Sequence, residues 1–289
     1  MFSGYFAAMV TPFFKDKLDL NSFEKHLGYL VDSGISGIVV CASTGEALSL
    51  STNERIDLVA TAAGVVNGKI KIIAGIIDSM TENCKALMKS TEDLVDGFLC
   101  ICPFYIKPSQ EQIYSHFRIL SESTGQKLIL YNNPARAGSC ISFDTLKILS
   151  ERKNIIGLKD CGSDLSVFSR WRIQLKDDFV FFSGDDSTAY GALALGARGV
   201  ISVTANVAPK MCAQTYRTFK QGNVEDFRYL RDTLAPLHFL MFDYPSPAPA
   251  KYALSRLGLI KNELRSPLSP IDAKTQAKID EFMEKVDIT

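Results

Sequence analysis

The stretch that decides the fold is residues 97–132, "GFLCICPFYIKPSQEQIYSHFRILSESTGQKLILYN". It begins and ends with a nearly continuous apolar run, which is typical of parallel strands covered on both faces. Between the runs, Ser109 is followed three residues later by Gln112, a capping box ahead of an apolar pattern of helical period. Gly125 marks the return from this helix to the second strand. The stretch therefore predicts a strand–helix–strand unit.

The same alternation runs along most of the chain. We expect strands at 5–10, 37–42, 71–76, 97–102, 127–132, 155–160, 179–184 and 199–204. Eight such units with short connections predict an α/β fold, a (β/α)₈ TIM barrel, over residues 1–222. A doubly wound sheet is the alternative, because periodicity cannot show that a sheet closes.

The chain continues beyond what a barrel needs. After an eighth helix at about 208–221, three more helical patterns follow, separated by the proline-rich turns "DYPSPAP" (243–249) and "RSPLSPI" (265–271). We therefore predict a C-terminal three-helix extension over residues 223–289, packed on the barrel or on a neighbouring molecule.

Composition excludes several classes of partner. The 289 residues include 32 Lys+Arg and 32 Asp+Glu, so no net charge draws the chain to nucleic acid or to an anionic membrane. No apolar run is long enough to span a bilayer. The apolar N-terminus lacks a basic region and is interpreted as the first strand rather than a signal peptide. Seven cysteines scattered through apolar segments predict reduced core thiols and a cytoplasmic protein.

Barrel active sites form where strands end and the following loops begin. Hydroxyl, phenol and basic side chains occupy these positions in the sequence: Thr11, Ser43, Thr44, Tyr105, Tyr131, Arg136, Lys159, Ser183, Ser202 and Thr204. The only histidines, His26, His116 and His238, lie inside helical patterns. We therefore expect no metal site and no serine–histidine hydrolase.

Lys159 is the predicted nucleophile. It ends the apolar run of residues 155–160, and an apolar cavity disfavours the charged ammonium, so the neutral amine can attack a ketone and form a Schiff base. Tyr131 could then relay protons through nearby hydroxyls such as Ser43 and Tyr105. Taken alone, a lysine at a strand end is more often a solvated charge. We expect the next two residues, Asp160 and Cys161, to point away from the site.

With these residues in this order, the chain resembles the dihydrodipicolinate synthase family within the N-acetylneuraminate lyase superfamily. The motifs span almost the whole chain in order: "TPF" (11–13), "STGEA" (43–47), "CPFYIKPSQEQIYSHF" (102–117), "YNNPARAG" (131–138), "GLKDCGSDL" (157–165), "SGDDS" (183–187), "GVISVTANVAP" (199–209) and "PSPAPAKYAL" (245–254). The resemblance implies condensation of pyruvate with L-aspartate 4-semialdehyde in the diaminopimelate route to lysine. It implies a covalent pyruvate–lysine imine and no cofactor.

The resemblance also assigns roles residue by residue. Lys159 would hold pyruvate, and Tyr131 would donate and accept protons. Ser43 and Tyr105 would complete the relay, with Tyr105 supplied by a neighbouring subunit of a homotetramer built as a dimer of dimers.

Further positions would contact the substrates. Thr44, Gly184 and the backbone of Ile201 would border pyruvate. Arg136 would clamp the carboxylate of the semialdehyde through two hydrogen bonds.

Some positions depart from the family pattern. Ser43 stands where threonine is usual, and Asn133 where an apolar residue is common. The positions of the lysine feedback site also differ: Ala47, Leu48, Thr52, Arg55, Ser79, Asn83 and Phe104 replace the polar, histidine, acidic and tyrosine groups of regulated enzymes. An ammonium tail needs an acid, so we expect weak or absent inhibition by lysine.

Two other functions are compatible with the sequence. One is a pyruvate-dependent lyase or aldolase of the same superfamily acting on a sugar acid, although Arg136 suits a small carboxylated aldehyde better. The other is a non-catalytic barrel, since common folds host many roles.

Overall fold

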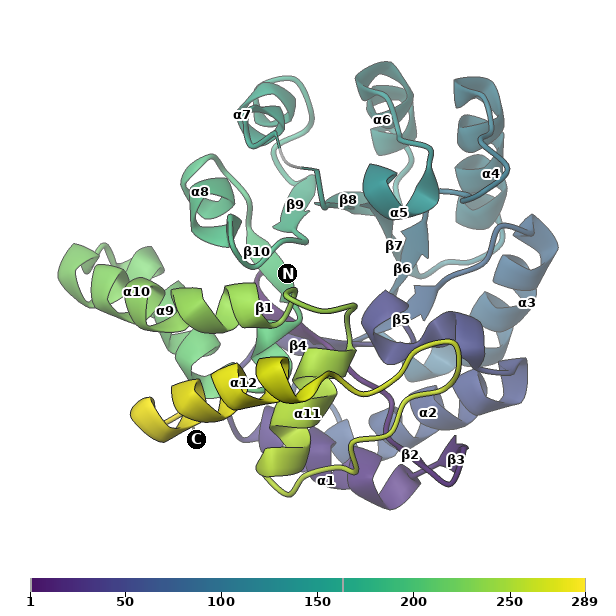
Figure 1. Ribbon diagram of the computed structural model, residues 1–289. Helices are drawn as coiled ribbons and strands as arrows, with labels where there is room; N and C mark the ends of the chain where they lie inside the picture. The colour runs from purple at the N-terminus through teal and green to yellow at the C-terminus, as the bar shows by residue number, and fades with distance from the viewer. Residues whose placement is uncertain (1, 163, 289) are drawn as a thin grey trace.

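The computed structural model describes residues 2–162 and 164–288, and in it eight parallel strands close into a barrel (Figure 1). The strands of the barrel are β1 (Gly4–Ala8), β4 (Gly37–Val40), β5 (Lys71–Ile76), β6 (Gly97–Ile101), β7 (Lys127–Asn132), β8 (Ile155–Asp160), β9 (Val180–Ser183) and β10 (Gly199–Ser202). β1 pairs with both β10 and β4, so the sheet has no edge. The predicted (β/α)₈ barrel is confirmed, and the doubly wound alternative is wrong.

Helices cover the outside of the barrel between successive strands (Figure 1). They are α1 (Leu20–Val31), α2 (Thr52–Val66), α3 (Thr81–Thr91), α4 (Gln110–Glu122), α5 (Pro134–Ala137), α6 (Phe143–Ser150), α7 (Ser166–Arg172), α8 (Ala189–Ala194) and α9 (Pro209–Gln221). Both predicted capping boxes are present, at Ser51–Glu54 before α2 and at Ser109–Gln112 before α4. Short 3₁₀ turns lie at η1 (Ser43–Gly45), η2 (Ala47–Ser49), η3 (Glu92–Leu94) and η4 (Thr204–Asn206), and β2 (Phe13–Phe14) pairs with β3 (Lys17–Leu18).

The strand register places the key polar residues side by side. Tyr131 on β7 pairs with Lys159 on β8, which in turn pairs with Phe182 on β9. At and below this level, the barrel interior is filled by apolar side chains such as Phe6, Ile129 and Phe182. Because side chains alternate between the two faces of a strand, Tyr131 and Lys159 both point into the barrel at its open end.

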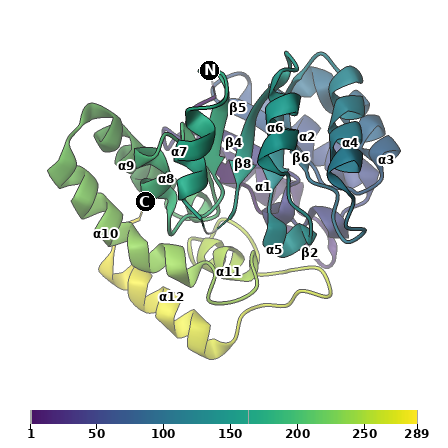
Figure 2. The same cartoon turned by 90° about the horizontal axis from the view of Figure 1, so that it is seen from above.

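Three helices complete the chain: α10 (Val224–Leu240), α11 (Ala248–Arg256) and α12 (Ala273–Lys285). They confirm the predicted three-helix extension. Figure 2 shows them gathered on one side of the molecule, at the end of the barrel where α5 and β2 lie. The predicted boundary after residue 222 falls between α9 and α10, and the division into two domains stays a prediction.

The cysteines are all free thiols. Five of them are buried, as expected for core residues, but Cys140 is exposed and Cys161 is only partly buried. The expectation of seven core cysteines is therefore wrong for these two. Within the described ranges, no helix combines the length and apolarity needed to cross a membrane.

Buried histidines make the fold sensitive to acid. His26 on α1 contacts the carbonyl oxygen of Asn206 at 3.2 Å, and burial lowers its pKa from 6.5 to about 4. Burial lowers the pKa of His116 to about 4 as well. Between these values the unfolded chain binds protons that the folded chain excludes, so stability is lost as the pH falls from about 6.5 to about 4.

We expect the free energy of unfolding to fall by about 1.4 kcal/mol per pH unit for each such histidine across this window. Urea unfolding at a series of pH values and one protein concentration measures the slope. His26→Gln is the matched variant, because its amide can still donate to Asn206 but does not titrate. Equal slopes for the two proteins would contradict the assignment.

Candidate active site

A cavity of about 480 Å³ opens where the barrel strands end. Of the eight residues predicted to form the site, all except Tyr105 line it: Ser43, Thr44, Tyr131, Arg136, Lys159, Gly184 and Ile201. They come from loops and strand ends that lie far apart in the sequence. The structure therefore brings together in one chain nearly all the side chains expected at the site.

Lys159 lies at the base of the cavity and is almost completely buried. Its side chain is only 5% exposed, and its Nζ lies 4.4 Å from the centroid of the Tyr131 ring. The negative face of the ring stabilises an ammonium at this distance, while the amine stays within reach of a ligand in the cavity. An amine with this access can attack a carbonyl carbon.

Because Gly184 has no side chain, it makes room for the side chain of Lys159. A Cβ at this position would lie 2.6 Å from Lys159 Cε and 2.1 Å from Cys161 Sγ. Both distances are shorter than any packed contact, so a larger residue would displace the lysine. Gly184 N–H also donates to the Asp160 carbonyl oxygen at 2.7 Å, which fixes the loop after β9 against β8.

Asn133 holds the Tyr131 hydroxyl. Its Nδ2 donates to Tyr131 Oη at 3.1 Å, while its Oδ1 accepts from the Arg136 backbone N–H at 3.2 Å and caps α5. Because Asn133 Oδ1 accepts the capping hydrogen bond, the group of the Asn133 side chain that faces the Tyr131 phenol is its NH₂ donor. The phenol oxygen thus accepts one hydrogen bond and keeps its own proton for another partner. Arg136, on the exposed side of α5, lies at the mouth of the cavity.

Ser43 and Thr44 reach the cavity from the turn η1, directly after β4. The Thr11 hydroxyl donates to the Gly45 carbonyl oxygen at 2.6 Å and ties this turn to the end of β1. Thr44 is 8% exposed. The two hydroxyls therefore sit on a short, well-anchored segment at the cavity wall.

The expectation for the residues after Lys159 was half right. Asp160 points away, accepting from Asn132 Nδ2 at 2.7 Å and from Gly162 N–H at 2.9 Å. Burial raises its pKa, and these hydrogen bonds oppose the rise. Cys161, however, lines the cavity, and the expectation that it points away is wrong. Strand alternation returns the second residue after Lys159 to the same face, so the pattern itself contained this signal.

Tyr105 does not reach the cavity of its own chain. Its side chain is 89% exposed, and its backbone N–H donates to the Ala137 carbonyl oxygen at 3.0 Å. Its place in a relay that includes a second subunit stays a prediction.

The C-terminal extension supplies one wall of the cavity, which the sequence did not reveal. The lining residues from this part of the chain are His238, Phe239, Phe242, Asp243 and Ser246. His238 and Phe239 lie at the end of α10, whereas Phe242, Asp243 and Ser246 lie in the turn that follows it. No local sequence signal marks these positions, because only the docking of the extension against the barrel brings them to the site.

His238 is held in place by both of its ring nitrogens. Nδ1 lies 2.8 Å from Thr204 Oγ1 and Nε2 lies 3.1 Å from the Tyr190 hydroxyl. Burial lowers its pKa.

The Ser183 hydroxyl, at the end of β9, donates to the Asp185 carbonyl oxygen at 3.0 Å. Among the described residues, no three His, Cys, Asp or Glu side chains are grouped to hold a metal ion.

Known proteins resemble this chain over its whole length. The model of the dihydrodipicolinate synthetase family matches residues 1–286. A 4-hydroxy-tetrahydrodipicolinate synthase from Thermotoga neapolitana is 39% identical over 280 residues, 95% of each chain. The structure of the 4-hydroxy-tetrahydrodipicolinate synthase from Methylacidiphilum fumariolicum SolV superposes with a TM-score of 0.96 at 35% identity, covering 99% of this chain and 96% of that one. The pyruvate complex of the chloride-inhibited dihydrodipicolinate synthase from Acinetobacter baumannii also has a TM-score of 0.96 at 35% identity, covering 100% of both chains.

Proposed function

Because this chain belongs to the dihydrodipicolinate synthetase family, we propose that it condenses pyruvate with L-aspartate 4-semialdehyde to give 4-hydroxy-tetrahydrodipicolinate. The observation that carries the proposal is the pairing of Lys159 with Tyr131 at the base of the cavity. A buried amine beside a phenol provides the nucleophile and the proton donor and acceptor that a Schiff-base enzyme needs. Solved relatives include a complex with pyruvate, the ketone that such an amine would bind.

The reaction begins with the Lys159 amine attacking the keto carbon of pyruvate. Loss of water gives an imine, and loss of a proton from the methyl carbon gives an enamine. The enamine carbon then forms a bond to the aldehyde carbon of the semialdehyde, whose oxygen takes up a proton. Attack of the substrate amino group on the imine carbon closes the ring and releases Lys159. Tyr131, held by Asn133 and close to the Ser43 turn, moves the protons.

Arg136 binds and orients the second substrate, aspartate 4-semialdehyde. The guanidinium at the cavity mouth can bind a carboxylate through two parallel hydrogen bonds. Thr44, Gly184 and Ile201 lie deeper, where a bound pyruvate would meet them. A small carboxylated aldehyde suits this arrangement better than a long polyol does.

We further propose that the protein is a cytoplasmic homotetramer. Three exposed side chains near the site support a subunit interface: Tyr105 at 89%, Leu48 at 67% and Ile106 at 63% exposed. An interface there would cover apolar area and bring Tyr105 to a neighbour. Free thiols are in keeping with a reducing compartment. Sedimentation velocity measures the oligomeric state.

Trapping with borohydride tests the proposed function. The protein is incubated with pyruvate and sodium borohydride, and its intact mass is measured. A pyruvyl adduct located on Lys159 by peptide mapping supports the Schiff base, and its absence would overturn it. A coupled assay with aspartate 4-semialdehyde, run in parallel with N-acetylneuraminate cleavage, then separates the synthase from a sugar-acid lyase.

Weak inhibition by lysine is a further expected property. The Ser79 hydroxyl donates to the Phe104 carbonyl oxygen at 2.8 Å, and Asn83 Nδ2 donates to Asp78 Oδ2 at 3.0 Å. The nearby acid, Asp78, is also used by the Met80 N–H at 2.8 Å. These groups are engaged with one another, so an ammonium tail would have to displace them. We expect millimolar lysine to leave the initial rate nearly unchanged, and strong inhibition at micromolar lysine would contradict this.

A further inference from the structure

The turn η1, which carries Ser43 and Thr44, ends in an unusual residue. Glu46 follows directly and has φ +54°, a left-handed conformation that residues other than glycine rarely adopt. Its N–H donates to the Ser43 carbonyl oxygen at 3.1 Å, and its carbonyl oxygen accepts from the Ser49 N–H at 2.8 Å. A strained conformation of this kind persists where the surrounding structure also holds it in place.

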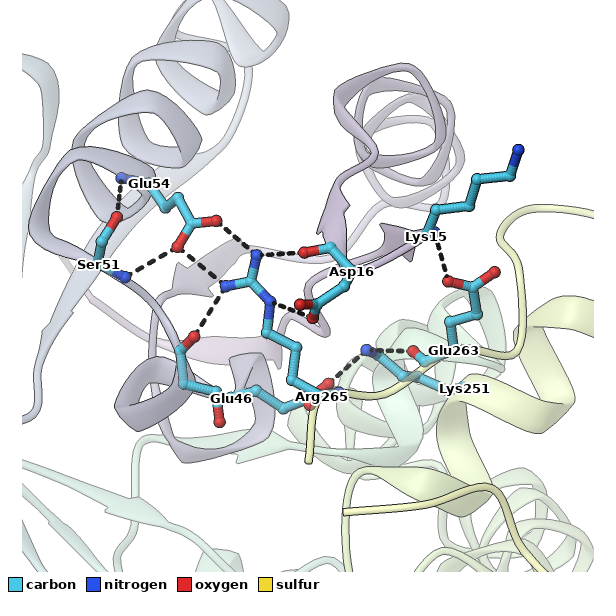
Figure 3. A network of polar contacts seen from close by, with 9 residues as sticks. Lys15, Asp16, Glu46, Ser51, Glu54, Lys251, Glu263 and Arg265 are labelled. Atoms are coloured by element: carbon cyan, nitrogen blue, oxygen red, sulfur yellow. Dashed lines mark hydrogen bonds and ion pairs between the residues drawn. The ribbon is translucent and has the colours of Figure 1, made fainter. Parts of the chain in front are cut away.

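The Glu46 side chain is held by the C-terminal extension. Figure 3 shows Lys251 reaching its carboxylate, while the Arg265 side chain extends toward Glu54 and Asp16. One oxygen contacts Lys251 Nζ, and the other accepts from the Arg265 backbone N–H at 3.1 Å. Both side chains of the ion pair are fully buried. The partners are more than 200 residues away in the sequence, so this contact joins the extension to the cavity wall.

The Lys251 ammonium is secured by other groups as well. Nζ donates to the Glu263 carbonyl oxygen at 2.8 Å and lies 4.3 Å from the centroid of the Phe13 ring. Burial lowers the pKa of Lys251 to about 8, and the Glu46 carboxylate opposes this fall. The Glu46 carboxylate, the Glu263 carbonyl oxygen and the Phe13 ring thus all contact the Lys251 ammonium.

Arg265 fixes the other end of the same segment. Its guanidinium donates to the Ser49 carbonyl oxygen at 2.8 Å and pairs with Glu54 at 2.6 Å (Figure 3). These contacts secure η2 and the start of α2. The extension thus contacts the segment that follows β4 at Glu46 and again at Ser49 and Glu54.

Stability alone is a poor reason for such a pair. The cost of removing two charges from water often exceeds their attraction, and an apolar pair can match the stability. An apolar pair cannot, however, direct the carboxylate of a strained residue to one position. We propose that Glu46 and Lys251 are positioning residues, whose buried ion pair lets the C-terminal extension hold the η1 turn at the wall of the cavity. This inference rests on the proposed function of that cavity.

The test uses Glu46→Gln/Lys251→Met, which removes both charges and leaves neither partner buried alone. We expect a folded protein whose kcat/KM for pyruvate falls by about 10- to 100-fold, because small displacements of positioned groups have effects of that size. The rate of borohydride trapping should fall in parallel. Arg256→Met is the control, because it removes an ion pair to Asp280 inside the extension and should leave kinetics unchanged.

The outcomes separate this inference from the proposed function. An inactive wild-type protein would overturn the proposed function, whereas an active wild type with an equally active, folded double variant would overturn only the positioning role. If the double variant does not fold, Glu46→Asp is the variant to measure. It keeps the carboxylate charge but moves it away from Lys251 by the length of one methylene group. A lower melting temperature with unchanged KM and kcat for pyruvate would then show a merely structural role and refute the inference.

Discussion

Replacing Lys159 by alanine is expected to abolish the condensation and the borohydride adduct together. Lys159 is the only lysine among the described residues that line the cavity, so no neighbouring amine can replace it. Removing a covalent nucleophile lowers kcat by roughly 10⁴-fold or more. Steady-state rates with pyruvate and aspartate 4-semialdehyde, and intact mass after trapping, measure the two effects.

The fold should survive this change. Lys159 faces the cavity rather than the packed core, so alanine removes few packing contacts, and we expect a melting temperature close to that of the wild type. Lys159→Arg is the matched control, because a guanidinium keeps the charge above the Tyr131 ring but stays protonated and cannot form an imine. Retention of the adduct in either variant would remove Lys159 from the proposed mechanism.

The sequence located the barrel strands closely because their burial is nearly continuous. The predicted bounds of β5, β7 and β8 agree with the structure. The predictions for β1 and β4 extended two residues too far. Residues 9–10 and 41–42 are apolar and buried but leave the barrel strands, and Cys41 has φ +58°. An apolar run indicates which residues are buried, but it does not indicate where the backbone stops being a strand.

The site was predictable where it depends on strand ends and hidden where it depends on tertiary packing. Lys159 and Tyr131 end neighbouring strands, so the barrel alone places them together. The cavity wall formed by the end of α10 and the turn after it brings together residues that no local pattern connects, and so does the ion pair between Glu46 and Lys251. Such contacts follow from how the extension docks, which helix periodicity does not specify.

Replacing Tyr131 by phenylalanine is expected to lower kcat by about 10²- to 10⁴-fold, the contribution of a positioned acid–base group. The ring that packs against Lys159 Nζ at 4.4 Å is retained, and only the hydroxyl is lost. Pyruvate should therefore still bind, while imine formation and proton loss from its methyl carbon slow down. Exchange of the pyruvate methyl protons into D₂O, followed by NMR, measures that step directly.

Asn133→Val provides the matched comparison, because it keeps the Tyr131 hydroxyl and removes the amide that donates to it at 3.1 Å. Without this donor the hydroxyl is free to rotate, so we expect a loss of kcat that is smaller than in Tyr131→Phe. Proton exchange at the wild-type rate in Tyr131→Phe would assign the relay to another group. A wild-type kcat in Asn133→Val would mean that Asn133 serves only to cap α5, and that the orientation of Tyr131 is set by the packing of its ring against Lys159.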